Sequence, residues 1–136
     1  MYFCNKLLTK QGYISYWIKS GNEYWDSADF CYKGGRYVDA LFFYCLAIEK
    51  YLKANYDLDN ITNQPPRIHE LQAIYSQTEV QLIPEFIDYI DNVNRWNLEG
   101  RYPDYKFSLH KIATAEYMHH HLIKLNKLRS CLLERL

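Results

Sequence analysis

The stretch GGRYVDALFFYCLAIEKYLKA, residues 34–54, carries the strongest pattern in the chain. After the glycine pair, apolar side chains recur at steps of three and four, the spacing that gathers them into one stripe of a helix. We therefore predict a long helix in the middle of a helical bundle. We also predict that Glu49 and Lys53 form an exposed ion pair on it, which would contribute about 0.3–0.5 kcal/mol.

The rest of the chain predicts further helices around this one. Periodic segments cover residues 14–33, 68–77, 84–100 and 104–133, and glycines or prolines stand at their ends. Residues 1–13 are predicted to be a lead-in, and residues 57–66 form a loop rich in turn-forming residues. The chain is thus expected to be a single domain over residues 1–136, an all-α, up-and-down bundle of about five helices.

The predicted last helix suggests an oligomer. If it begins at Asp104 and ends at Leu133, it is about 40 Å long, more than the two preceding helices can cover. The chain also has 14 tyrosines and 3 tryptophans, side chains that suit helix seams and interfaces. We therefore predict a homodimer that forms through the last helix and its flanking turn.

Composition limits the classes of function. The chain has 16 Lys and Arg against 16 Asp and Glu, so a globally basic surface for nucleic acid is excluded. The charges are unevenly placed, however: residues 101–136 hold seven basic and three acidic residues. This basic last segment suits phosphates or an acidic partner surface, or it is an ordinary solvated helix face.

Cysteine usage and hydropathy indicate a compartment. The 4 cysteines show no Cys-x-x-Cys spacing, which favours small buried side chains in a reducing environment. No span approaches the roughly 20 consecutive apolar residues of a membrane helix. A cytoplasmic protein without membrane attachment is expected.

The turn Arg101-Tyr102-Pro103-Asp104 is the leading candidate site. Pro103 disfavours helical torsions at Tyr102, so a helix should start just after that residue. A guanidinium beside a helix N-terminus, with its unpaired amides, favours a phosphate. The alternative is internal: Asp104 caps the helix and pairs with Arg101, leaving no group for a ligand.

Other polar residues are weaker candidates. His69 is a possible base, or a cap or interhelical hydrogen-bond partner at the start of the third helix. Glu49 and Lys53 either reach a nucleotide phosphate or are solvated. The run His119-His120-His121 lacks the four-residue spacing of helical metal sites, so one inward and two exposed histidines and no metal are expected. Phosphate-loop, dinucleotide and Ser/His/Asp patterns are missing, and no cofactor is predicted.

These residues resemble a known family. The segment AIEKYLKA, residues 47–54, resembles the second helix of HEPN domains, which are small all-helical proteins often partnered with minimal nucleotidyltransferases. Three further segments match in order over residues 14–135: Trp25, Ala28 and Asp29 in the first helix, His69-Glu70-Leu71 before the third, and Arg101-Tyr102-Pro103-Asp104 before the last. The resemblance implies a dimeric helical bundle.

The resemblance also implies two alternative functions. One is a noncatalytic nucleotide- or RNA-binding module that uses Arg101, Tyr102, Asp104, Glu49, Lys53 and His69 and works with a nucleotidyltransferase. The other is a metal-independent RNase toxin of a toxin–antitoxin pair, with Arg101 and His110 as catalytic residues. In the family pattern the histidine follows after four to six residues, whereas eight residues separate Arg101 from His110 here. This departure favours the binding module.

Overall fold

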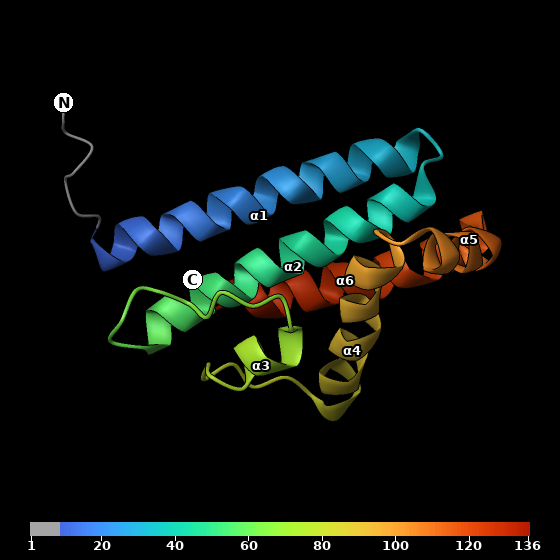
Figure 1. Cartoon of the computed structure of the whole chain (residues 1–136). Coiled ribbons are helices and arrows are strands. Elements are labelled where there is room, and N and C mark those ends of the chain that lie inside the picture. Colours follow the sequence, from blue (N-terminus) through green and yellow to red (C-terminus); the bar gives the residue numbers. More distant parts are fainter. Residues whose placement is uncertain (1–8) are drawn as a thin grey trace.

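A computed structural model describes residues 9–136, apart from the side chains of Pro103 and Tyr105. This part of the chain contains helices and no strand (Figure 1), which confirms the predicted all-α fold class. The helices are α1 (Lys10–Lys33), α2 (Tyr37–Asp59), α3 (Leu71–Tyr75), α4 (Pro84–Glu99), α5 (Pro103–Ile112) and α6 (Ala115–Leu133).

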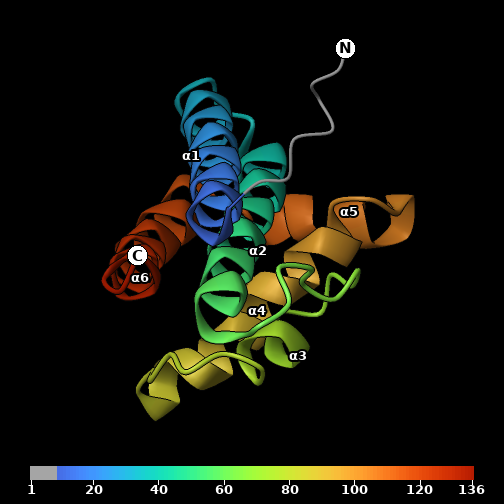
Figure 2. The ribbon, with the colours of Figure 1, turned by 90° about the vertical axis from the view of Figure 1, so that its left-hand side faces the viewer.

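Helix α2 is the centre of the bundle, as its sequence predicts. It contacts all five other helices, and the end-on view shows α1, α4 and α6 arranged around it (Figure 2). Fifteen of its 23 residues are buried, including Leu41, Tyr44, Ile48 and Leu52.

The α1–α2 hairpin depends on two glycines. Gly35 has φ 77°, a left-handed conformation that suits glycine, and it turns the chain between the two helices. Gly21 lies against the ring of Tyr51, where a Cβ atom would stand 2.5 Å from the ring carbon Cε1. These glycines let α1 pack closely along α2.

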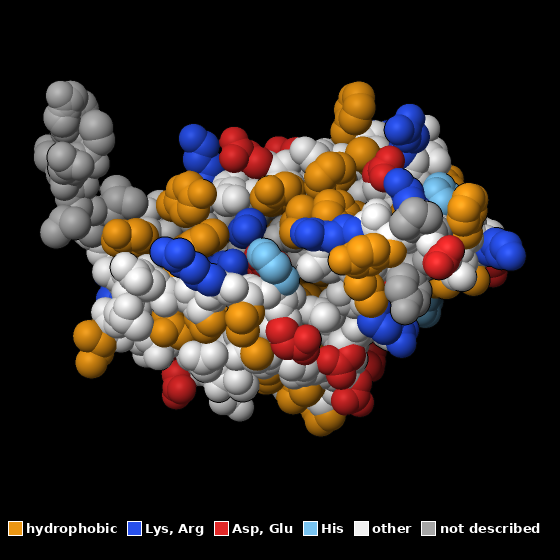
Figure 3. Space-filling model, in the orientation of Figure 1, with side chains coloured by type: hydrophobic (Ala, Val, Ile, Leu, Met, Phe, Trp, Pro, Cys, Tyr) orange, Lys and Arg blue, Asp and Glu red, His pale blue; other side chains and the backbone are white. Residues whose placement is uncertain are grey.

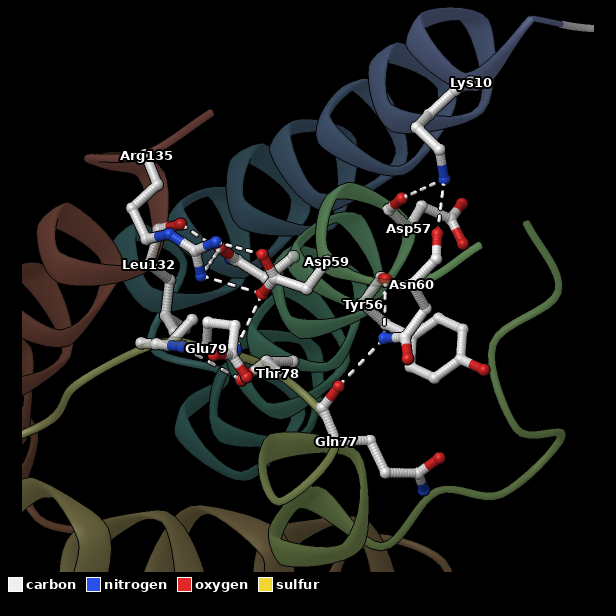
Figure 4. A network of polar contacts seen from close by, with 12 residues as sticks. Lys10, Tyr56, Asp57, Asp59, Asn60, Gln77, Thr78, Glu79, Leu132 and Arg135 are labelled. Atoms are coloured by element: carbon white, nitrogen blue, oxygen red, sulfur yellow. Dashed lines mark hydrogen bonds and ion pairs between the residues drawn. The ribbon is translucent and has the colours of Figure 1, made fainter. Parts of the chain in front are cut away.

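Both helices of the hairpin are longer than predicted. Helix α1 begins at Lys10, so residues 10–13 belong to it rather than to a lead-in, and residues 1–8 lie outside the described residues. The Thr9 hydroxyl accepts a hydrogen bond from the Gly12 amide and caps α1. Helix α2 continues to Asp59 because Lys10 Nζ donates to the carbonyls of Asp57 and Asn60 at its end (Figure 4).

The predicted last helix is wrong in its length. It is two helices, α5 and α6, separated at Ala113 and Thr114. The Thr114 hydroxyl accepts from the Tyr117 amide at 3.1 Å and caps α6. Residues 9–136 therefore contain six helices, and the 40 Å helix that suggested a dimer does not exist. The third helix is also shorter than expected, covering Leu71–Tyr75.

Two basic side chains of the C-terminal segment are used inside the fold. Arg135 forms an ion pair with Asp59 at the end of α2 (Figure 4). Arg129 donates hydrogen bonds to Tyr51 and Asn22 and lies over the ring of Trp25. These two guanidinium groups hold α6 onto the hairpin instead of forming a basic ligand surface. No helix in residues 9–136 has the length and apolarity needed to cross a membrane.

Candidate functional site

A buried carboxylate organises the polar side of α2. Glu49 is 0% exposed, and its Oε2 atom lies 3.1 Å from Lys53 Nζ and 3.3 Å from Lys50 Nζ. Burial alone would raise the pKa of Glu49, but the two lysines and the hydrogen bonds of Lys53 and His69 outweigh it and lower that pKa. The prediction of an exposed, solvated Glu49–Lys53 pair is therefore wrong, because α3 and its preceding loop cover this part of α2.

His69 is held by that carboxylate. Its Nδ1 atom lies 3.0 Å from Glu49 Oε1. Because an ionised carboxylate only accepts hydrogen bonds, Nδ1 carries the proton, and the Nε2 atom of a neutral ring is then an acceptor. The ring is otherwise exposed. Of the two structural roles considered for His69, the structure shows the interhelical hydrogen bond, while Glu70 is the residue that precedes α3.

Arg101 follows α4 and is exposed, with its guanidinium held from two sides. Its Nε atom donates to Asn97 Oδ1 at 3.0 Å, one helical turn earlier. Its Cζ atom lies 5.5 Å from the centre of the Phe42 ring on α2. Among the described residues no carboxylate lies within ion-pairing distance of Arg101. The internal Arg101–Asp104 pair that we considered is therefore not formed.

A shallow depression of about 310 Å³ lies on one side of Arg101. We call it the amide cleft because two asparagines of α4 line it beside the histidine, and its lining residues are His69, Glu70, Asn94, Asn97, Leu98, Arg101 and Tyr102. Asn94 Oδ1 also accepts from the Leu71 amide and caps α3, which fixes the position of His69 relative to α4. The amide cleft offers hydrogen-bond donors and acceptors with little net charge.

A second depression of about 320 Å³ lies on the other side of Arg101. Arg101, Lys106, Phe107 and His110 line it, and we call it the cationic cleft. Lys106 has one long ion pair, 3.8 Å to Asp39 Oδ1, and His110 is exposed near the end of α5. The structure thus brings Arg101 and His110 to the same cleft although eight residues separate them.

The remaining candidates occupy the edges of the site. Tyr102 precedes α5, is exposed and lines the amide cleft. Asp104 is exposed in the first turn of α5 and makes no side-chain hydrogen bond with the described residues. Lys53 is buried with Glu49 and lines a different pocket, so it does not face Arg101. The predicted site residues therefore form two groups, one at Arg101 and one along α2.

The histidine run separates as predicted into one buried and two exposed side chains, and His121 is the buried one. The Tyr89 hydroxyl and His121 Nδ1 share a hydrogen bond of 2.7 Å. Burial and the nearby His120 and Lys124 lower the pKa of His121 to about 4. In the described chain, no three His, Cys, Asp or Glu side chains are grouped closely enough to hold a metal ion.

Sequence reasoning missed part of the site. Asn94, Asn97 and Lys106 line the clefts, yet the sequence did not single them out. The spacing of Asn94, Asn97 and Arg101 by three and four residues is a signal for one helix face, and it was available in the sequence. The contact between Arg101 and Phe42 had no such signal, because it depends on how α4 crosses α2.

The fold and the clefts define a class of protein: a small all-helical bundle that presents an arginine between two surface clefts. A comparison with protein families matches the HEPN domain over residues 14–135. The chain therefore belongs to the HEPN domain family. No curated protein and no solved structure matches this sequence.

Proposed function

We propose that this HEPN domain is a nucleotide- or RNA-binding module whose phosphate receptor is Arg101. The observation that carries the proposal is the state of this guanidinium. It is exposed, it is oriented by Asn97 and Phe42, and no carboxylate among the described residues neutralises it. Such a pre-oriented fork of N–H donors suits the geometry of a phosphate.

The charges around Arg101 support an anionic ligand. The cationic cleft combines Arg101 with Lys106 and His110. The space-filling view shows several Lys and Arg side chains across the middle of the molecule, with hydrophobic side chains between them (Figure 3). The amide cleft supplies His69, Asn94 and Asn97, which suit the hydroxyls of a sugar or the edge of a base. A nucleic-acid backbone carries phosphates and sugars in alternation and matches this neighbouring pair of clefts.

The test is an affinity comparison with a matched control. Arg101→Ala should weaken binding of a fluorescent single-stranded RNA about tenfold, the effect of losing one hydrogen-bonded phosphate contact. Arg95→Ala is the control, because Arg95 is also exposed and bonded to an asparagine of its own helix, Asn92. Equal affinities of the two variants would refute the proposal.

A second candidate function has a specific observation in its favour. Arg101 and His110 line one cleft, as a metal-independent endoribonuclease would require. In this reaction His110 would remove the proton from a ribose 2′-hydroxyl, and the 2′-oxygen would bond to phosphorus as the bond from phosphorus to the 5′-oxygen breaks. The leaving 5′-oxygen would take a proton from water. Arg101 would stabilise the charge on the phosphoryl oxygens. Cleavage of RNA in the presence of EDTA, lost in both Arg101→Ala and His110→Ala, would establish this reaction.

Assembly is the third part of the proposal. We place a homodimer contact on α5, where Phe107 is 70% and Ile112 is 52% exposed. A nucleotidyltransferase is the proposed partner protein, in a toxin–antitoxin pair or another two-component system in the cytoplasm. Light scattering of the pure protein should give the mass of two chains, and Ile112→Glu should give the mass of one.

A further inference from the structure

A pocket larger than either cleft beside Arg101 lies elsewhere on the molecule. It has a volume of about 410 Å³ between α1 and the loop that follows α2. Its lining residues, which define what we call the aromatic pocket, are Tyr13, Tyr16, Trp17, Lys53, Asn63, Gln64, Pro65, Pro66 and Arg67. The lining thus combines three aromatic rings with two cationic side chains.

The aromatic wall is held in place before any ligand binds. Trp17 Nε1 donates to Asp57 Oδ2 at 2.9 Å. Lys50 Nζ and Lys53 Nζ lie 5.5 Å and 5.3 Å from the centre of the Trp17 ring. Tyr16 packs edge-on against the same ring at 5.0 Å and is itself 56% exposed. Trp17 is thus fixed, and Tyr16 is available to a ligand.

The charge of the pocket selects the kind of ligand. Lys53 and Arg67 line it, and none of the described lining residues is acidic. Asn63 and Gln64 add amide groups at its loop side. A neutral aromatic base linked to a negatively charged phosphate fits this lining, because the base stacks on tyrosine or tryptophan while the phosphate meets the lysine or arginine.

The position of the pocket connects it to Arg101. Lys53 of the aromatic pocket and Phe42 beneath Arg101 are both on α2, eleven residues apart. At the helical rise per residue this separation is about 16 Å along the axis. Glu49 lies between Phe42 and Lys53 along α2, and it holds His69 at that point of the helix. Figure 3 shows basic and histidine side chains, with hydrophobic ones between them, along this face.

We infer that the aromatic pocket is a base-stacking subsite for single-stranded RNA, occupied by a base a few nucleotides away from the phosphate at Arg101. This inference rests on the proposed function and specifies its ligand. A duplex keeps its bases stacked inside and cannot place one in such a pocket, whereas a single strand can. The ligand is therefore an unpaired strand rather than a duplex or free phosphate.

The experiment measures two ligands, a labelled single-stranded RNA of twelve nucleotides and inorganic polyphosphate, which has charge but no bases. Tyr16→Ala should weaken RNA binding about tenfold, as loss of one stacked base does, and leave polyphosphate binding unchanged. Tyr16→Phe, which keeps the ring, should bind RNA within about twofold of the wild type. Phe30→Ala is the control on the same helix, since Phe30 is 80% exposed and outside the pocket.

The outcomes separate this inference from the proposed function. RNA affinity unchanged in Tyr16→Ala, or polyphosphate affinity reduced equally, overturns the base-stacking subsite. If Arg101→Ala alone weakens RNA binding, the phosphate receptor stands and the subsite does not. If Tyr16→Ala alone weakens it, the subsite stands and the receptor at Arg101 is wrong. Circular dichroism spectra matching the wild type exclude misfolding as the cause in each variant.

Discussion

Two carboxylates of α2, Glu49 and Asp57, are both fully buried, yet their pKa values shift in opposite directions. Glu49 has cations around it, and its pKa is lowered. Burial raises the pKa of Asp57 to about 6, against the opposing hydrogen bond of Trp17 and the charge of Lys10. Its Oδ1 atom has no hydrogen-bond partner among the described residues. Each carboxylate nevertheless positions one side chain of the proposed RNA surface: His69 in the first case and Trp17 in the second. Burial is common to both, so the partners decide the direction in which each pKa shifts.

The largest expected effect on stability comes from removing the Glu49 carboxylate, which has more cationic partners than that of Asp57. Glu49→Ala leaves Lys53 buried without a counter-charge, and the free energy of unfolding should fall by about 3–5 kcal/mol. Denaturant titration at pH 7 measures it. Asp39→Ala is the control on the same helix, because Asp39 is partly exposed and its ion pairs contribute at most about 1 kcal/mol. A loss no larger than that of the control would show that Glu49 is not a buried ion-pair centre.

Removing the charge of Asp57 should change the free energy of unfolding by less, and it should raise it rather than lower it. Since the pKa of Asp57 is about 6 in the folded chain and about 3.9 when unfolded, the folded state binds more protons in this window, and stability falls as pH rises from about 4 to 6. Asp57→Asn removes this fall. The variant should gain on the order of 1–2 kcal/mol over the wild type at pH 7, and this gain should vanish near pH 4.

Unfolding curves of both proteins at each pH test the prediction for Asp57. His121 titrates in the same window, because its folded pKa is about 4, but its contribution is equal in both proteins and cancels in the difference. A difference that does not change with pH would contradict the raised pKa of Asp57.

Substitutions in the two clefts beside Arg101 should differ in how they change the salt dependence of RNA affinity. Lys106→Ala removes a charge from the cationic cleft, so RNA affinity should fall about threefold and its salt dependence should weaken. Lys111→Ala, on the same helix but outside the cleft, is the control. His69→Ala removes a hydrogen-bonding group that is not proposed to meet a phosphate, so affinity should fall about twofold with an unchanged salt slope. Identical slopes for Lys106→Ala and wild type would remove the distinction between the clefts.

Much of the fold could be predicted from local pattern. The stripe of α2, the glycine turn after α1 and Pro84 at the start of α4 are local signals, and the structure confirms all three. The break at Thr114 was missed because a threonine cap is a weaker signal than glycine or proline. Residues 10–13 were misassigned because their helix end is capped by Thr9 and tied to the distant end of α2 through Lys10.

The site was less predictable than the fold. Arg101 was chosen as a candidate because of its turn, but the burial of Glu49 depends on the loop before α3 and has no local signature. The aromatic pocket joins Tyr16 and Trp17 of α1 with a loop some fifty residues away, a contact that only tertiary packing creates. Patterns within one helix are visible in a sequence, whereas contacts between distant elements are not.

The central claim is that the Arg101 guanidinium binds a phosphate of RNA. Its most direct test is the slope of the logarithm of RNA affinity against the logarithm of salt concentration, measured for the wild type, Arg101→Ala and Arg95→Ala. Loss of one phosphate contact on a single strand should reduce the slope by about 0.7 in Arg101→Ala and leave it unchanged in Arg95→Ala. Parallel lines for all three proteins would contradict the claim.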